Sequence, residues 1–227
     1  MTFEQIQRRL STLDTACVCD ANKSLNLDLH VMDPGIRPIR YGLKLLGRAH
    51  TLTCYNDFLT VIKALHDAVP EEVLVIDSQQ SNKALTGELF PTEAMRKGLA
   101  GIINDGPCRD TAIVRSMDIP YYARSVTCVA GTTNRLFETQ IPITCGGVPV
   151  NPGDILFGDD DGVLVATDQV FATLIPMAEA IQAKETQLLD GMTNGISLLE
   201  MTNFTEHCAK IQAGQESTLQ FRVPSSE

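Results

Sequence analysis

The spacing of apolar residues predicts alternating helices and strands over the first two thirds of the chain. Apolar positions three or four residues apart predict helices at residues 2–13, 15–21, 58–66, 91–98 and 109–117. Alternating or continuous apolar runs predict strands at residues 43–54, 73–77, 101–104 and 119–123. This alternation predicts an α/β fold whose parallel or mixed sheet is covered on both faces.

The pattern changes after residue 140, where short apolar runs are separated by Gly and Pro turns. These runs predict antiparallel strands at residues 141–145, 147–150, 155–157 and 163–166. A long helix is then expected from Gln169 to about Leu189. We expect one catalytic domain over residues 1–191 and a C-terminal extension over residues 192–227, for which packing on a neighbouring subunit is one possibility.

Composition narrows the classes of function. The net charge of −10 argues against a nucleic-acid partner, because phosphate backbones are bound mainly by Lys and Arg. No apolar run approaches the roughly 18 residues of a membrane helix, so no membrane partner is expected. Seven cysteines form an odd set without a CxxC pair, which favours reduced thiols in a cytoplasmic protein.

Candidate chemistry is concentrated between Asp105 and Asp110, directly after the strand predicted at residues 101–104. Ligands of α/β sheets bind at the carboxyl ends of strands. There Arg109 could bind a carboxylate with two hydrogen bonds, and Asp110 offers a hard oxygen ligand for Mg²⁺ or Mn²⁺. Alternatively, Asp105-Gly106-Pro107 is only a turn and Asp110 complements a helix dipole. Spacing alone favours neither interpretation.

A second candidate segment, Gly87-Glu88-Leu89-Phe90, precedes the helix predicted at residues 91–98. Its backbone amides could face an anion, and Glu88 could contact a metal-bound water. An exposed Glu before a helix is more often a capping or solvated residue. The four histidines form no zinc motif, and no lysine falls clearly inside an apolar strand as a Schiff-base aldolase would require.

The acid at position 88, twenty intervening residues and then Arg109-Asp110 resemble a family motif. This acid-x20-Arg-Asp pattern is similar to that of the 4-hydroxy-4-methyl-2-oxoglutarate/4-carboxy-4-hydroxy-2-oxoadipate aldolases. Those enzymes belong to a larger family that includes the regulator of RNase E activity A, RraA. Further matches lie at residues 13–21, 72–77, 101–110, 122–125, 146–154 and 159–165. The resemblance spans roughly residues 10–190 and implies an RraA-like layered α/β/β/α sandwich with a mixed central sheet.

The resemblance also implies roles for residues. Asp110 would be the direct ligand of Mg²⁺ or Mn²⁺, and Arg109 would bind the substrate and its developing enolate. The segment that begins at Gly87 would hold the pyruvyl carboxylate through the amides of Leu89 and Phe90.

Two acids complete the implied catalytic set. The family motif usually has Asp where this chain has Glu88. The longer Glu88 side chain would therefore act on the substrate's proton through an intervening water. An acidic residue from an adjacent subunit can complete the site in these aldolases, and Glu185 is the candidate here.

The resemblance implies a metal-dependent, class II pyruvate aldolase. It would cleave a 4-hydroxy-2-oxo acid to pyruvate and a second oxo acid. Oxaloacetate decarboxylation passes through the same pyruvate enolate and is therefore expected as well. A homotrimer or homohexamer is implied, with active sites in clefts between subunits. The alternative is a non-catalytic RraA-like protein that binds and regulates a ribonuclease.

Overall fold

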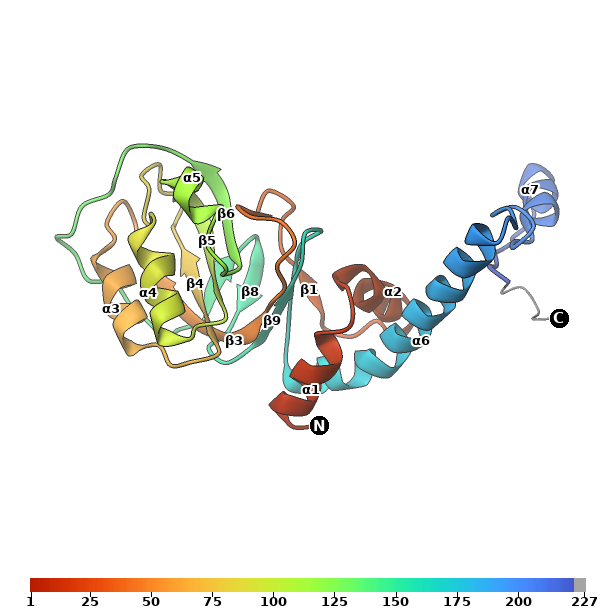
Figure 1. The fold of residues 1–227 in the computed structure, drawn as a ribbon, viewed down its shortest axis with the longest axis horizontal. Helices are drawn as coiled ribbons and strands as arrows, with labels where there is room; N and C mark the ends of the chain where they lie inside the picture. The colour runs from red at the N-terminus through yellow and green to blue at the C-terminus, as the bar shows by residue number, and fades with distance from the viewer. Residues whose placement is uncertain (223–227) are drawn as a thin grey trace. The chain divides into compact units, whose positions relative to one another are not determined.

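The computed structural model of the protein describes residues 1–222 (Figure 1). In chain order, its elements are α1 (Phe3–Leu10), α2 (Thr15–Leu25), β1 (His30–Val31), β2 (Arg37–Pro38), β3 (Leu45–Thr53), α3 (Leu59–Asp67), β4 (Glu72–Asp77), α4 (Leu89–Lys97), β5 (Gly101–Cys108), α5 (Thr111–Val114), β6 (Tyr121–Val126), β7 (Ile143–Cys145), β8 (Val148–Val150), β9 (Ile155–Gly158), β10 (Val163–Ala166), α6 (Asp168–Thr193) and α7 (Phe204–Gln212).

Eight strands form one mixed sheet in the order β1-β10-β9-β3-β4-β5-β6-β2. The four central strands, β3 to β6, are parallel, whereas β9 joins β3 in the antiparallel direction. The remaining strands, β7 and β8, form a separate antiparallel hairpin. This arrangement confirms the expected α/β class with a mixed central sheet.

The central strands are buried on both faces, as their nearly continuous apolar sequences predict. Leu74 and Ile76 of β4 point into a core shared with α3 and α4, whereas Val73 and Val75 point into a second core shared with the β7–β8 hairpin. Figure 1 shows α3, α4 and α5 together on one side of the sheet. Because β4, β5 and β6 are parallel, the loops that follow them lie at the same edge of the sheet.

Local signals in the sequence explain two helix ends. Thr2 caps α1 and forms a capping box with Gln5, which satisfies two backbone amides at the helix start. Gly98 ends α4 in the left-handed conformation with φ of 73°, which glycine adopts at little cost.

The region after Asn104 differs from its prediction. We expected the strand to end at Asn104 and a helix to run from Arg109 to Met117, but β5 continues to Cys108 and α5 is only four residues long. Pairing with β6 resumes at Pro107 after an irregularity in the register, so this segment is a bulged strand rather than a turn. Arg109 and Asp110 therefore precede a single helical turn rather than the longer helix that the sequence predicts.

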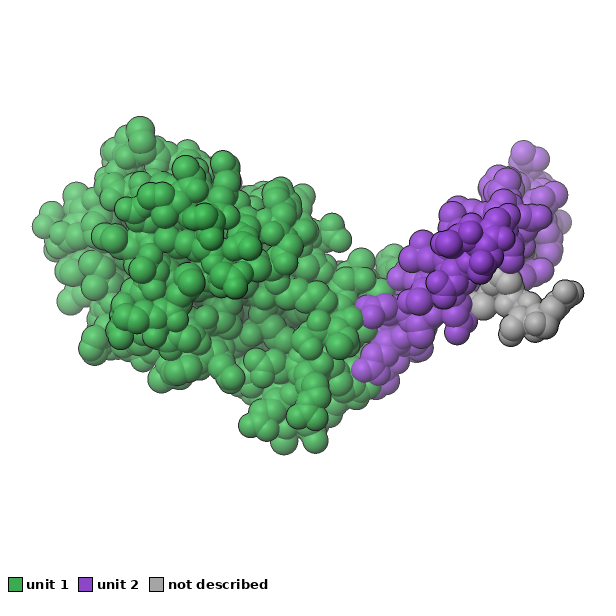
Figure 2. Space-filling view, viewed as in Figure 1, with its two compact units in different colours: residues 1–175 green, residues 176–227 purple. Residues whose placement is uncertain are grey.

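The chain divides into two compact units, residues 1–175 and the residues from Pro176 onward (Figure 2). The boundary falls within α6 at Pro176, which cannot donate a helical hydrogen bond. The second unit contains the remainder of α6 and the helix α7, and its buried apolar side chains include Leu188 and Met201. None of the described helices is long and apolar enough to cross a membrane. The domain boundary expected at residue 191 stays a prediction.

Candidate functional site

The two segments selected from the sequence lie side by side. Thr86 and Cys108 form a parallel β-bridge, and the backbone N–H of Arg109 donates to the carbonyl of Thr86 over 3.1 Å. The N–H of Glu88 then donates to Oδ2 of Asp110 over 3.3 Å. Backbone pairing thus places the residues after Thr86 against the residues after Cys108, although 22 positions separate Glu88 from Asp110.

Gly87 makes the close approach possible. A Cβ atom at this position would lie 2.3 Å from Oδ2 of Asp110 and 3.1 Å from Nε of Arg109. Because the nearest atom belongs to the short Asp110 side chain, any larger residue would displace that carboxylate. Asp110 itself has a left-handed backbone with φ of 57°, which Asp tolerates better than most residues. Gly87 and Asp110 therefore fix the shape of the site together.

The charged groups of this site are only lightly engaged within the described residues. Nε of Arg109 lies 3.3 Å from Oδ2 of Asp110, and their side chains are 42% and 34% exposed. The separation is long for a charge-assisted hydrogen bond, which is typically about 2.7–2.9 Å. The guanidinium and the carboxylate can consequently reach a ligand without first breaking a strong ion pair.

Backbone donors stand next to these charges, at the start of α4. The N–H of Phe90 makes a long bond of 3.3 Å to the carbonyl of Gly87, and Pro91 has no N–H to contribute. For the N–H of Leu89, the described residues supply no acceptor. An unpaired N–H at a helix start favours an anion such as a carboxylate. This agrees with the use that the resemblance implies for Leu89, whereas the N–H of Phe90 is engaged by Gly87.

Asp110 is the hard oxygen donor that this site offers to a cation. Within residues 1–222, no group of three or more His, Cys, Asp or Glu side chains could hold a metal. Mg²⁺ is commonly bound by one or two carboxylates, with waters and substrate oxygens completing its shell. The part-exposed carboxylate of Asp110 fits that requirement.

The two remaining acids lie in different parts of the chain. Glu88 is the N-cap residue of α4 but makes no side-chain cap hydrogen bond, so the capping interpretation gains no support, whereas a solvated side chain agrees with the structure. Glu185 lies on α6 in the second compact unit and is exposed. Its contribution from a neighbouring subunit stays a prediction, as do the chemical roles of Glu88, Arg109 and Asp110.

An apolar groove adjoins the site between α3 and α4. Its volume is about 670 Å³, and Leu89, Phe90 and Arg109 line one end. Phe58 packs edge-on against Phe90 with ring centroids 5.9 Å apart, which holds the Phe90 side chain in the groove wall. Leu89 is 72% exposed at the groove. Apolar surface therefore borders the charged groups on this side.

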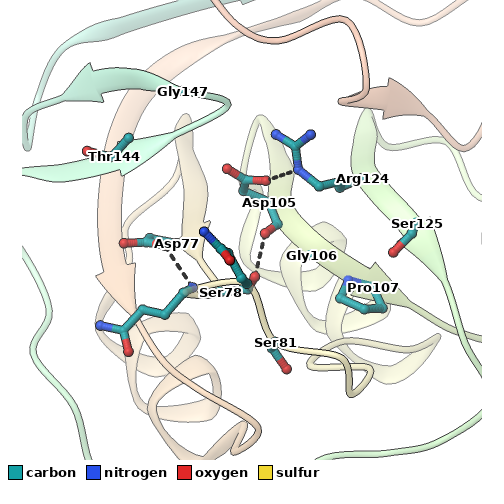
Figure 3. Close-up of a pocket in the computed structure, with 12 residues that line it drawn as sticks. Asp77, Ser78, Ser81, Asp105, Gly106, Pro107, Arg124, Ser125, Thr144 and Gly147 are labelled. Atoms are coloured by element: carbon teal, nitrogen blue, oxygen red, sulfur yellow. Dashed lines mark hydrogen bonds and ion pairs between the residues drawn. The ribbon is translucent and has the colours of Figure 1, made fainter.

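A second cavity of about 760 Å³ lies at the carboxyl ends of β4, β5 and β6 (Figure 3). Its charged lining consists of Asp77, Asp105 and Arg124, of which the sequence had singled out only Asp105. Figure 3 shows the Asp105 carboxylate turned toward the guanidinium of Arg124. The available signal was an Asp and an Arg near the ends of two consecutive predicted strands.

The charges of this cavity are committed to one another. Nε of Arg124 donates to Asp105 in a short hydrogen bond, and Nη1 donates to Asp33 over 3.0 Å. These bonds raise the pKa of Arg124, the bond to Asp105 most strongly. Oδ2 of Asp105 also accepts the N–H of Gly146 over 2.6 Å. The cluster ties β5, β6 and the hairpin loop together, which is a structural task.

Asp77 is the one acid of the cavity without a cationic partner among the described residues. Its Oδ1 accepts the N–H of Gln79 over 2.8 Å. Burial raises the pKa of Asp77, and the nearby Asp105 adds to the increase. Arg124, the cation in the lining of this cavity, is already bonded to Asp105 and Asp33, so an anionic ligand finds less available positive charge here than at Arg109.

Comparison with known sequences identifies the family. A family model described as RraA-like, Aldolase/RraA, matches residues 15–165. A protein from Halalkalibacterium halodurans that bears the provisional name 4-hydroxy-4-methyl-2-oxoglutarate aldolase is 31% identical over 176 residues. That alignment covers 77% of this chain and 82% of the relative.

Solved structures support the fold. An uncharacterised protein from Pseudomonas syringae pv. tomato superposes with a TM-score of 0.75 at 24% identity, covering 86% of this chain and 94% of that one. The RNA-processing inhibitor RraA from Thermus thermophilis superposes with a TM-score of 0.60 at 28% identity. The latter match covers 65% of this chain and 90% of that one.

Proposed function

From the premise that this chain belongs to the RraA-like family, we propose that it is a divalent-metal-dependent carbon–carbon lyase acting on 2-oxo acids. Its reaction would be the cleavage of a 4-hydroxy-2-oxo acid, of the 4-hydroxy-4-methyl-2-oxoglutarate or 4-carboxy-4-hydroxy-2-oxoadipate type. The products would be pyruvate and a second oxo acid. Decarboxylation of oxaloacetate is the companion activity that we propose, since it forms the same pyruvate enolate.

One observation carries the proposal: the convergence of Asp110, Arg109 and the start of α4 around Gly87. The N–H of Glu88 reaches Asp110, and Arg109 lies beside the same carboxylate. A hard anionic ligand, a planar cation and the amide hydrogen of Leu89, which has no acceptor among the described residues, are thereby available close together. A pyruvate-like substrate needs all three, because it carries a carboxylate and a ketone on adjacent carbons.

The protein groups divide the retro-aldol reaction between them. The amides at Leu89 and Phe90 would bind the carboxylate, and Arg109 would place its guanidinium beside the C2 oxygen. Glu88 would accept the proton of the C4 hydroxyl through a water. The C3–C4 bond then breaks, its electron pair moves toward C2, and the second oxo acid leaves. Protonation at C3 gives pyruvate.

Asp110 would hold Mg²⁺ or Mn²⁺, because a carboxylate is the hard oxygen ligand that these ions prefer. The cation supplies Lewis acidity that stabilises the negative charge developing on the ketone oxygen. Arg109 adds a second positive charge on the same side and fixes the plane of the substrate.

Assembly and compartment follow the family. We propose a homotrimer or homohexamer in which Glu185 of a neighbouring subunit completes the water network. Within residues 1–222 none of the seven cysteines forms a disulfide, which is consistent with a cytoplasmic location. Light scattering on the purified protein measures the assembly. A fully active monomer of 24.7 kDa would contradict the shared site.

The activity itself is tested by pyruvate release. The purified chain is incubated with 4-hydroxy-4-methyl-2-oxoglutarate and with oxaloacetate, each with Mg²⁺ and with excess chelator. We expect pyruvate from both substrates, dependent on Mg²⁺, and little above background from the Asp110→Asn variant. The proposal would be overturned if neither substrate, nor any member of a wider panel of 4-hydroxy-2-oxo acids, gave Mg²⁺-dependent pyruvate release.

Similarity to an RNA-processing inhibitor supports a second candidate, a non-catalytic regulator of a ribonuclease. The two candidates differ in the demand they place on Arg109 and Asp110, since a regulator acting through its surface needs neither residue for chemistry. The convergence around Gly87 therefore favours the lyase. Inhibition of a ribonuclease by the Asp110→Asn variant as strong as by wild type, in a chain without lyase activity, would reverse that preference.

A further inference from the structure

A buried polar network lies directly behind the two segments of the proposed site. Thr86, Asn104 and Tyr121 have at most 2% of their surface exposed, yet their polar groups meet. The hydroxyl groups of Thr86 and Tyr121 share a short hydrogen bond. Nδ2 of Asn104 donates to Oγ1 of Thr86 over 3.1 Å. The three side chains come from different parts of the sequence and converge on Thr86.

The network joins the two site segments rather than either segment alone. Nδ2 of Asn104 also donates to the carbonyl of Pro107 over 2.9 Å. The same amide group therefore holds the segment that leads to Gly87 and the part of β5 that leads to Arg109. The carbonyl of Thr86 accepts the N–H of Arg109. A displacement of Thr86 would therefore change the position of Gly87 relative to Arg109.

Stability alone does not account for Asn104. Its Oδ1 is buried and has no hydrogen-bond partner among the described residues, which makes the amide only half satisfied. An unpaired buried acceptor costs free energy, and an apolar residue of similar shape would avoid that cost. The benefit of Asn104 must then come from its Nδ2, which fixes the spacing of Thr86 and Pro107.

We propose that Tyr121, Thr86 and Asn104 are positioning residues that set the register between the carboxylate-binding amides after Gly87 and the Arg109–Asp110 pair. This inference rests on the proposed function for its catalytic consequence. None of the three touches the substrate. Their effect passes through Thr86 and Pro107, and it matters because misplacement of reacting groups by about 1 Å can lower a rate about a hundredfold.

The chain offers a matched control in the adjacent tyrosine. Tyr122 is also fully buried, but its hydroxyl donates to the carbonyl of Asp159 over 2.8 Å, and its ring lies in the core on the other face of the sheet. Tyr121→Phe and Tyr122→Phe each remove one buried phenolic oxygen. Only the first removes it from the network behind the site.

The experiment compares wild type, Tyr121→Phe and Tyr122→Phe by amide hydrogen exchange and by Mg²⁺-dependent oxaloacetate decarboxylation. We expect Tyr121→Phe to accelerate exchange in residues 86–90 and 108–110 severalfold, because the loss of the shared bond permits local opening. We expect its kcat to fall about tenfold or more, with a smaller change in KM, since Arg109 acts mainly on charge that develops during the reaction. Tyr122→Phe should change neither quantity.

A second pair covers the case in which Tyr121→Phe fails to fold. Thr86→Ser keeps the hydroxyl, whereas Thr86→Val keeps the shape and removes it. We expect the serine variant to recover at least half of the activity that the valine variant loses.

The outcomes separate the network from the proposed function. An active wild type with equal kcat and equal exchange in Tyr121→Phe would overturn the positioning role. Parallel losses in Tyr121→Phe and Tyr122→Phe would also overturn it, because they would show general destabilisation. An inactive wild type would instead overturn the lyase, while faster exchange confined to residues 86–90 and 108–110 in Tyr121→Phe would still support the network.

Discussion

Two arginines near the carboxyl edge of the same sheet have opposite relations to their acidic neighbours. Arg124 on β6 bonds to Asp105 and Asp33, and these bonds raise its pKa. Arg109, just beyond β5, has one contact of 3.3 Å to Asp110. Arg124 lines the larger cavity, whereas Arg109 has the charge that is more available to a ligand. Cavity size and chemical availability thus point to different places.

The difference teaches that the partners of a charged group say more about its use than the space beside it. A guanidinium with two carboxylate partners would have to lose them before it could bind a substrate carboxylate. The Arg124 cluster instead connects β5, β6 and the hairpin loop through Asp105 and Gly146. Arg109 and Asp110 retain unused bonding capacity, and we therefore place the chemistry there.

The largest expected effect comes from removal of the divalent cation. A chelator should lower pyruvate release by roughly a hundredfold or more, the scale of losing a main electrostatic stabiliser of the transition state. Mg²⁺ or Mn²⁺ added in excess should restore it. The measurement is the steady-state rate on oxaloacetate after exhaustive chelation, and full activity of the metal-free protein would exclude the metal-dependent reaction.

Arg109→Lys should have the next largest effect. Lysine keeps the charge but lacks the planar fork, so kcat should fall at least about tenfold with the melting temperature nearly unchanged. Arg124→Lys is the matched control at the other cluster, and it should lower stability while the folded protein keeps its kcat. If the Arg124 variant alone lost activity, the larger cavity would have to be the reactive site.

For stability the order of the two arginines is reversed, and a substitution at Arg124 should cost more than one at Arg109. Arg124→Met removes two charge-assisted hydrogen bonds and leaves Asp105, which is 16% exposed, without its cation. We expect a loss of about 1.5–3 kcal/mol in the free energy of unfolding. Arg109→Met should cost much less because its one contact is long and exposed. Urea denaturation of both variants makes the comparison, and equal losses would contradict it.

The smallest expected effect is a stabilisation. Burial raises the pKa of Asp77, so its contribution to stability is present below its ordinary pKa of 3.8 and is lost as the pH rises through the higher folded-state value. Asp77→Asn should therefore stabilise the protein at pH 7, by of order 0.5 kcal/mol. The gain should shrink as the pH falls through the raised folded-state value toward 3.8, and it should be absent below that pH. Melting curves across this pH range test the sign.

Asp57 provides the opposite case. Burial raises its pKa, but hydrogen bonds from Thr132 and from three backbone amides outweigh that effect, so the pKa lies below its ordinary value. Its stabilising contribution is present at neutral pH and is lost as the pH falls through the lowered value. Asp57→Asn should therefore destabilise at pH 7. The same sign of change in both variants would refute the electrostatic assignments.

The sequence predicted the central sheet well because its signals are local. Continuous apolar runs identified β4 and the start of β5, and the caps at Thr2 and Gly98 mark helix ends. The extension of β5 to Cys108 depends instead on pairing with β6, which is a tertiary interaction. Asp105-Gly106-Pro107 has the composition of a turn, but a proline at a bulge leaves the strand pairing intact on either side.

Site residues divide along the same line. The motif placed Glu88 and Arg109-Asp110 in one site, and the bridge between Thr86 and Cys108 brings those segments together. Arg124 received no role, because its pairing with Asp105 and Asp33 joins three segments whose register the sequence does not specify. The sequence likewise did not predict the left-handed backbone of Asp110, because that conformation depends on where the bulged strand ends.

The central claim is that Asp110, rather than an acid of the larger cavity, holds the divalent cation. Mn²⁺ is titrated into wild type, Asp110→Asn and Asp77→Asn, and the free ion is monitored by electron paramagnetic resonance. The titrations give the Mn²⁺ affinity of each protein. We expect Asp110→Asn to weaken binding at least about tenfold, the scale of losing an important metal contact, and Asp77→Asn to bind as wild type does. Undiminished affinity in Asp110→Asn, together with weakened binding in Asp77→Asn, would contradict the account.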